Sequence, residues 1–398
     1  APACQHGGMT NSSGQVPDEP GAPRPHHGAH GSPPPGPGPY GPHGPYGPAG
    51  PYGGPPPGGV PPYGFGPLAP QPGIIPLRPL VLPEIYAGVV NLLRANPQAV
   101  LAPAAIIAAI TTFIAGVVQY ALVRQVPGNL PTEVTDPESL RTMLNWFSVV
   151  LLGQLLAAMV AFAGGTVYTG VLSPVLGRSV LGGRMSLGEA WRATGPRVAE
   201  LLGLAVVELL LFVLPAGALL GATLLLGSSG LPSGQVAAGT LLLLLLGLAY
   251  LAYVLFLVAR LAVTAPALAL EGLGVTGALR RSWRLVQGGS WRVLGIVVLT
   301  NLIAGLLGSV VLVLFRPFEA IEGIGTAVSF VGAAVSTAIT YALQAGVTGV
   351  LYTDRRMRAE GFDTALRTAA EQNERLGWVP ATVDDLWRTG PAGGAGRG

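Results

Sequence analysis

After Arg94, the chain alternates long runs of uncharged, mostly apolar residues with short segments that carry arginine. The uncharged runs cover 95–123, 142–177, 209–259, 293–315 and 323–353. A transmembrane helix needs about 20 apolar residues, so every run is long enough to cross a bilayer. The longest run is interrupted by Gly227-Ser228-Ser229-Gly230, which predicts a loop between two helices.

The pattern therefore predicts an all-α membrane protein with six transmembrane helices. We expect a transmembrane domain over 80–376 that holds these helices and ends in a short cytoplasmic helix. The six consecutive leucines at 241–246 are typical of a helix that faces lipid or is buried all round. The expected spans lie near 98–123, 143–171, 201–226, 236–259, 293–315 and 323–352.

Three shorter segments have the periodicity of amphipathic surface helices, and each precedes a pair of spans. They cover 82–96, 185–197 and 274–292. Ser186 and Glu189 have the spacing of a capping box at the start of a helix. We therefore expect a unit of one cytoplasmic surface helix and two spans, repeated three times. The expected apolar face of the third segment consists of Val275, Leu279, Trp283 and Val286.

The distribution of arginine predicts the orientation in the membrane. Fourteen arginines lie on one side of the six spans and three on the other, and loops rich in arginine remain in the cytoplasm. Both termini are therefore expected in the cytoplasm. The three arginines on the outer side are Arg124, Arg141 and Arg316.

Tryptophan and arginine on the surface helices also predict contacts with lipid. Trp191-Arg192 and Trp283-Arg284 occupy corresponding places, and basic helices with tryptophan are typical of anionic membrane surfaces. The alternative is that these segments are ordinary cytoplasmic loops with a positive charge. The candidate ligands of lipid headgroups are Arg192, Arg280, Arg281 and Arg284.

The first 79 residues have a different composition, with 24 prolines and 19 glycines. Such a segment has too little apolar surface to offset the entropy lost on ordering, so we expect a disordered cytoplasmic tail. Other proteins are candidate partners of this tail, but its proline and tyrosine motifs are expected by chance in such a composition and identify none. Residues 377–398 are expected to form a second disordered tail.

Composition restricts the chemistry of the transmembrane domain. Only 10% of the residues are charged and mean hydropathy is +0.53, whereas about a quarter of a globular chain is charged. All 22 basic residues are arginine, the five histidines lie in the first 43 residues, and Cys4 is the only cysteine. We therefore expect no catalytic residues, cofactor or metal, a non-enzymatic function, and no binding of nucleic acid. The pattern Gly272-Leu273-Gly274-Val275-Thr276-Gly277 matches a dinucleotide-binding fingerprint, but it follows a membrane helix instead of a strand.

One acidic residue lies inside a predicted span. Glu208 is about ten residues into the third span, or about 15 Å along the helix axis. A carboxyl group at such depth normally faces protein or water. It either binds protons, cations or a polar substrate, or it is a packing residue that is protonated or hydrogen-bonded to another span. The candidate intramembrane polar site consists of Glu208, Gln154, Asn301 and Gln344.

Three passages resemble a known family. Residues 72–80 read PGIIPLRPL, residues 270–295 read LEGLGVTGALRRSWRLVQGGSWRVLG, and residues 351–363 read LYTDRRMRAEGFD. Together they resemble uncharacterised actinobacterial multi-pass proteins named for the membrane domain of glycerophosphoryl diester phosphodiesterases. The resemblance, over about 72–370, implies a membrane domain in a bacterial inner membrane. It does not imply phosphodiesterase activity, which belongs to a separate catalytic barrel in some relatives.

Two functions remain open at this point. The leading hypothesis is a non-enzymatic scaffold or accessory factor of the cell membrane. The alternative is a lipid or small-solute transporter whose polar path involves Glu208. An essential Glu208 with measurable flux would favour transport, and recruitment of partners by the tail would favour the scaffold.

Overall fold

The computed structural model describes residues 71–124, 136–228, 232–321 and 323–388, which belong to one compact unit that begins at Phe65. Every regular element within these residues is a helix, so the predicted all-α fold is confirmed. The predictions made for residues 1–70 and 389–398 lie outside the described residues.

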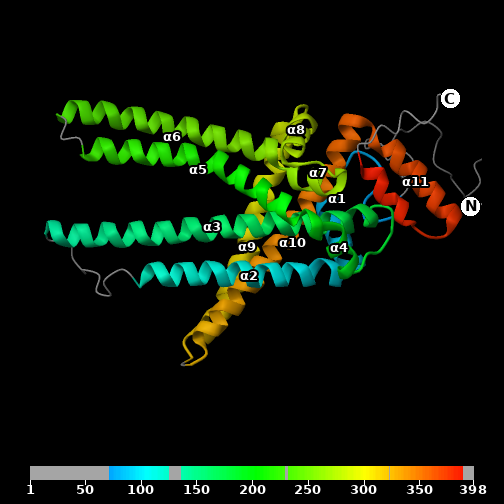
Figure 1. The fold of residues 1–398 in the computed structure, drawn as a ribbon, viewed down its shortest axis with the longest axis horizontal. Helices are drawn as coiled ribbons and strands as arrows, with labels where there is room; N and C mark the ends of the chain where they lie inside the picture. Colours follow the sequence, from blue (N-terminus) through cyan, green and yellow to red (C-terminus); the bar gives the residue numbers. More distant parts are fainter. Residues whose placement is uncertain (1–70, 125–135, 229–231, 322, 389–398) are drawn as a thin grey trace, which may run out of the picture. The chain divides into compact units, whose positions relative to one another are not determined.

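Six long helices pair into three hairpins (Figure 1). Among the described residues, these six are long and apolar enough to cross a membrane, which confirms the predicted number of spans. The pairs are α2 (Pro97–Val123) with α3 (Pro137–Ser179), α5 (Val198–Ser228) with α6 (Ser233–Leu261), and α9 (Ser290–Glu319) with α10 (Gly325–Glu360).

Short helices precede each hairpin, in the order that the expected repeated unit requires. Figure 1 shows them gathered at one end of the hairpins, which we call the arginine-rich end. The second hairpin is preceded by α4 (Leu187–Thr194) and η1 (Gly195–Arg197), and the third by α7 (Thr264–Glu271) and α8 (Val275–Val286). The others are α1 (Leu82–Ala95) before the first hairpin, and α11 (Phe362–Leu376) and η2 (Ala381–Trp387) after the third.

Local sequence signals explain several helix ends. The capping box predicted for α4 is present, since Ser186 Oγ accepts from Glu189 N at 3.3 Å and Glu189 Oε2 accepts from Ser186 N at 2.8 Å. Gly272 ends α7 with a φ of 72°, a left-handed conformation that glycine adopts without strain. Gly272 and Gly274 therefore link two helices, and no strand precedes them in the described chain.

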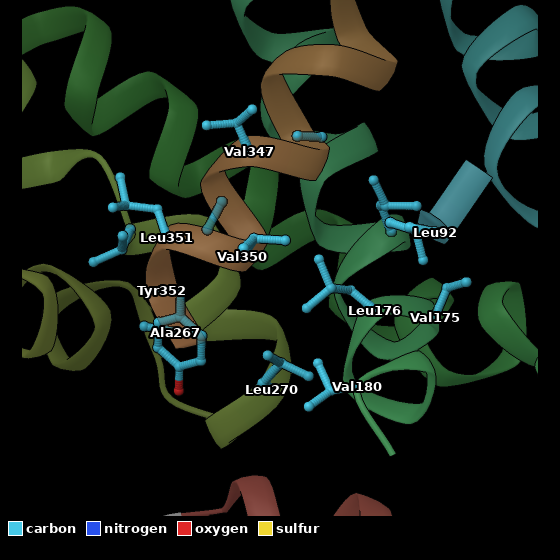
Figure 2. Packing of buried hydrophobic residues seen from close by; sticks show 14 of the residues in the cluster. Leu92, Val175, Leu176, Val180, Ala267, Leu270, Val347, Val350, Leu351 and Tyr352 are labelled. Carbon is cyan, nitrogen blue, oxygen red and sulfur yellow. The ribbon is translucent and has the colours of Figure 1, made fainter. Parts of the chain in front are cut away.

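The hydrophobic core lies at the arginine-rich end, around the second half of α10. That helix packs against α9, α2, α3 and α1. Figure 2 shows Val350 of α10 pointing toward Leu176 of α3, whereas Leu351 points to the other side of α10, and all three are buried. The leucines of 241–246 are mostly exposed, by 44% to 67% for five of them, as expected for a helix that faces lipid.

Residues 72–80, which we call the strap, are packed into this core in an irregular conformation. Ile75, Leu77 and Leu80 have no exposed surface, and Leu80 N donates to Asp354 Oδ1 at 2.8 Å. The prediction that disorder continues to residue 79 is wrong. The prolines and glycines of this segment predicted a large loss of conformational entropy on ordering. The burial of its apolar side chains offsets that loss.

The prediction of a disordered tail from residue 377 is also wrong for its first part. Trp387 in η2 is only 1% exposed, and its ring lies 5.1 Å from the ring of Phe362. Asp384 binds Arg178 at 2.7 Å. The large apolar area of a buried tryptophan fixes this segment on the bundle.

Candidate functional site

A cavity of about 550 Å³ lies between α3, α5, α6, α7, α9 and α10, and its wall includes the last turn of α6 and the start of α7. Its wall combines apolar side chains with uncharged polar ones. Glu208 is the only charged side chain among the described residues that line it. The polar lining consists of Thr166, Thr169, Glu208, Thr264, Thr300, Asn301, Ser336, Thr337, Thr340, Tyr341, Gln344 and Thr348.

Glu208 is positioned by α5 and is 5% exposed. Its partner is none of the predicted amides: the hydroxyl of Thr264 donates to Glu208 Oε1 at 2.5 Å. Thr264 is the first residue of α7, so the carboxyl group lies beside a helix N-terminus, where negative charge is favoured. The second oxygen, Oε2, has no hydrogen-bond partner in the described part of the chain.

Asn301 and Gln344 line the same cavity as Glu208. Gln344 Nε2 donates to Asn301 Oδ1 at 2.8 Å, which links α10 to α9. Asn301 Nδ2 donates in turn to the carbonyl of Val297 at 2.8 Å. The structure thus brings three of the four predicted polar residues together.

Gln154, the fourth predicted residue, is placed elsewhere. It is exposed on α3 and is not part of the cavity lining. Ala161, the first lining residue of α3, follows seven positions later, or about 10 Å along the helix axis. Hydropathy alone does not resolve depth within a span, which is why Gln154 was grouped with the others.

Arg281 differs from its predicted role as a headgroup ligand. It is 8% exposed, and its Nε donates to both oxygens of Glu271, at 2.7 and 2.8 Å. Its Nη2 donates to Glu360 Oε2 at 2.8 Å, and Nη1 donates to the same carboxylate. Burial lowers the pKa of Arg281, but the pairs with Glu360 and Glu271 raise it further, so the guanidinium stays charged. It therefore ties α8 to α7 and α10.

A second buried ion-pair cluster, which the sequence did not predict, holds the strap. Asp354 is completely buried and accepts from Arg292 Nη1 at 2.8 Å and from Arg358 Nε at 3.0 Å. Both arginines also donate to the carbonyl of Leu80, at 2.6 and 2.7 Å. The three passages that carried the family resemblance therefore meet here, and their role in this structure is to join the strap, α9 and α10.

The remaining candidate headgroup ligands, Arg192, Arg280 and Arg284, are exposed. Trp191 and Trp283, beside two of them, are 50% and 37% exposed. The apolar face of α8 is rotated from the predicted one, since its buried residues are Ala278, Arg281, Ser282, Leu285 and Val286.

A larger hollow of about 970 Å³ lies between the strap, the end of α3 and α11. Its lining carries both signs of charge, and two of its arginines are already paired, Arg178 with Asp384 and Arg367 with Asp363. We therefore take the intramembrane cavity as the candidate site. No group of three or more histidine, cysteine, aspartate or glutamate residues that could hold a metal ion occurs among the described residues.

Comparison with known proteins agrees with the resemblance seen in the sequence. Residues 184–352 match the family described as "Membrane domain of glycerophosphoryl diester phosphodiesterase". The matched region runs from the segment before α4 to the second half of α10 and contains Glu208, Asn301 and Gln344. It is shorter than the 72–370 suggested by sequence. No curated protein and no solved structure matches the chain.

Proposed function

We propose that this multi-pass membrane protein, which carries a region of the glycerophosphoryl diester phosphodiesterase membrane-domain family, binds a membrane lipid or small solute in its interhelical cavity. The observation that carries the proposal is a polar cavity between the spanning helices with Glu208 in its wall. Buried polar groups between transmembrane helices are costly unless they serve packing or a ligand. The role is non-enzymatic, and the phosphodiesterase activity in the family description is not carried over.

The cavity favours the transport alternative over the scaffold alternative. A scaffold that recruits partners through a tail has no need of a polar cavity between its spans. Two lining residues, Phe162 and Asn301, are exposed, so the cavity opens at the surface of the spanning helices. The outer surface of spanning helices contacts lipid, which supports a ligand that enters from the bilayer.

The placement of the exposed arginines supports a location and an orientation. We propose that the protein lies in a bacterial inner membrane with both termini in the cytoplasm. Arg192, Arg280 and Arg284 would then meet anionic headgroups of the cytoplasmic leaflet, each contributing about 1 kcal/mol to membrane attraction.

The test is retention of a native ligand by the purified protein. Thr337 lines the cavity from α10, whereas Val335 on the same helix is 39% exposed and faces away. Wild type and Val335→Trp should co-purify with the same small molecule, identified by native mass spectrometry. Thr337→Trp fills the cavity and should lose it. Equal retention by both variants would contradict the proposal.

A further inference from the structure

The hydrogen-bonding state of the cavity wall restricts what it can hold. Nine hydroxyl side chains line the cavity, and seven of them already donate their single hydrogen to an oxygen of the protein. What these seven still offer to an occupant is lone pairs. They are Thr166, Thr169, Thr264, Thr300, Ser336, Thr340 and Tyr341.

The carboxyl and amide oxygens of the wall are also free to accept hydrogen bonds. Glu208 Oε2 and Gln344 Oε1 have no hydrogen-bond partner among the described residues. Thr337 and Thr348 are the two lining hydroxyls without a partner in that part of the chain, and each can donate or accept. Asn301 Nδ2 and Gln344 Nε2 each use one of their two hydrogens, so with the two threonines four described lining groups can still donate. These are fewer than the seven hydroxyl oxygens and the two free carboxyl and amide oxygens that can accept, so the wall complements a polar group that donates.

Charge gives an independent restriction. The described lining contains no arginine or histidine that could pair with an anion. The positive N-terminal end of α7 is already beside Glu208, through the bond from Thr264. A phosphate group would bring negative charge and hydrogen-bond acceptors into a wall that already presents a carboxyl group and acceptors. The wall would therefore not compensate the phosphate for its lost hydration.

The rest of the lining is apolar. The apolar lining includes Phe162, Phe212, Val258 and Val297, and Phe162 is 37% exposed at the outer surface of the spanning helices. An occupant with an apolar tail can therefore keep its head near Glu208 and its tail in contact with the bilayer.

We propose that the cavity is selective for an uncharged amphiphile with a hydroxyl head that donates a hydrogen bond to Glu208. This inference rests on the proposed function, because it names the class of molecule that the same cavity takes. The proposal distinguishes this protein from proteins that bind phosphate-bearing lipids, because a phosphate-binding site would need basic residues in its wall.

Three probes with identical chains isolate the head group: 1,2-didecanoylglycerol, its 3-acetyl ester, and didecanoyl phosphatidate. The ester replaces the donating hydrogen with a small acetyl group, and the phosphatidate adds negative charge. Affinities are measured by native mass spectrometry on the full-length protein in a neutral detergent. We expect didecanoylglycerol to bind at least about tenfold more tightly than either analogue, as the loss of one buried hydrogen bond predicts.

Variants link the preference to Glu208. Glu208→Leu should bring the three probes within about threefold of one another, while Glu208→Gln, which keeps an acceptor oxygen, should retain a preference for the alcohol. Glu200→Gln is the matched control, since Glu200 is exposed near the start of the same helix and should behave as wild type. Circular dichroism and elution volume check that each variant is folded.

The outcomes distinguish the two proposals. Equal binding of the three probes by wild type, or tightest binding of phosphatidate, would overturn the hydroxyl selectivity but leave binding in the cavity intact if Thr337→Trp abolishes it. Binding that Thr337→Trp does not change would overturn both. No binding of any probe would overturn the hydroxyl selectivity, and retention of the native ligand would then decide whether the cavity binds a ligand. A preference for the alcohol that survives Glu208→Leu in a folded protein would overturn the role given to Glu208.

Discussion

The buried charges of this protein are concentrated at the arginine-rich end, and Asp354 is the most completely enclosed of them. It has no exposed side-chain surface, yet it accepts from two arginines and from the backbone N–H of Leu80. A buried carboxylate is tolerated only when its oxygens are satisfied in this way. Removal of its charge would leave Arg292 and Arg358 without their counterion.

We therefore predict that Asp354→Asn lowers the free energy of unfolding by about 3 kcal/mol or more. The matched control is Asp363→Asn, because Asp363 is partly exposed and forms only a weak pair with Arg367 at 3.5 Å. That change should cost less than about 1 kcal/mol. Stability is measured as the loss of soluble protein on heating in detergent. A similar effect of the two substitutions would contradict the structural role given to Asp354.

At the scale of elements, the strap depends on close contact between backbones. A Cβ atom added to Gly73 would lie 2.1 Å from the carbonyl oxygen of Ser179, at the end of α3. The same contact includes the hydrogen bond from Ile74 N to Ser179 O at 3.1 Å. Only glycine fits at this position, and any larger residue has to push the strap away from the core.

Gly73→Ala should accordingly destabilise the protein by about 1 to 3 kcal/mol, the usual cost of overpacking. Gly217→Ala is the control, since a Cβ atom added to this glycine of α5 would have nothing within 4 Å. Alanine in a helix should leave stability unchanged or raise it by up to about 1 kcal/mol. Thermal stability in detergent compares the two, and limited proteolysis near residue 70 reports release of the strap. A Gly73→Ala protein as stable and as resistant as wild type would show that the strap does not need this contact.

The η2 segment gives a second test at this scale. Trp387→Ala removes a ring that packs on Phe362 and Tyr352, and its expected cost is about 3 to 5 kcal/mol. Trp378, which lies before η2, is 61% exposed, and Trp378→Ala should cost less than about 1 kcal/mol. Unfolding monitored by near-UV circular dichroism distinguishes them. Comparable losses would mean that η2 is not anchored by its tryptophan.

The elements that sequence predicted well are those whose signal is local. Six long apolar helices and the capping box at Ser186 follow from residues close in the chain. The strap, the burial of Arg281 and the packing of Trp387 depend on partners that lie far along the sequence, such as Glu360 for Arg281. Helical periodicity placed Arg281 on a polar face because periodicity contains no information about partners that are distant in the sequence.

The candidate site shows the same division. Glu208 could be found because one acid stands in an apolar run, and Asn301 and Gln344 because they are polar within spans. Thr264 could not be found, since threonine is ordinary at a helix start and its bond to Glu208 joins α7 to α5. The acceptor character of the wall depends on which way each hydroxyl donates, and that requires the helices in place.

For the whole molecule, the orientation of the spans can be tested with single cysteines in a Cys4→Ser background. We predict that Gly234→Cys and Ala320→Cys react with a membrane-impermeant maleimide added to intact cells. Cysteines that replace Gly188, Gly288 and Glu374 should react only after the cells are opened. All five positions are exposed, so access to the thiol is not limited by packing. Labelling of the residue 288 variant in intact cells would reverse the proposed topology.

The attachment of the strap to α10 and α11 also sets an order of assembly during synthesis. Leu80 is separated by 274 residues from Asp354, and Leu77 by 290 from Arg367, whose guanidinium donates to its carbonyl. At 5 to 20 residues per second, a ribosome needs roughly 14 to 55 s to make the partner of Leu80 after Leu80 itself. The start of the strap can already meet Ser179 of α3, but its end at Leu77 and Leu80 lacks these partners until the last span and α11 have been made. A chain that stops before α10 lacks these partners, so we expect the strap to reach its native packing only after the C-terminal hairpin has been made.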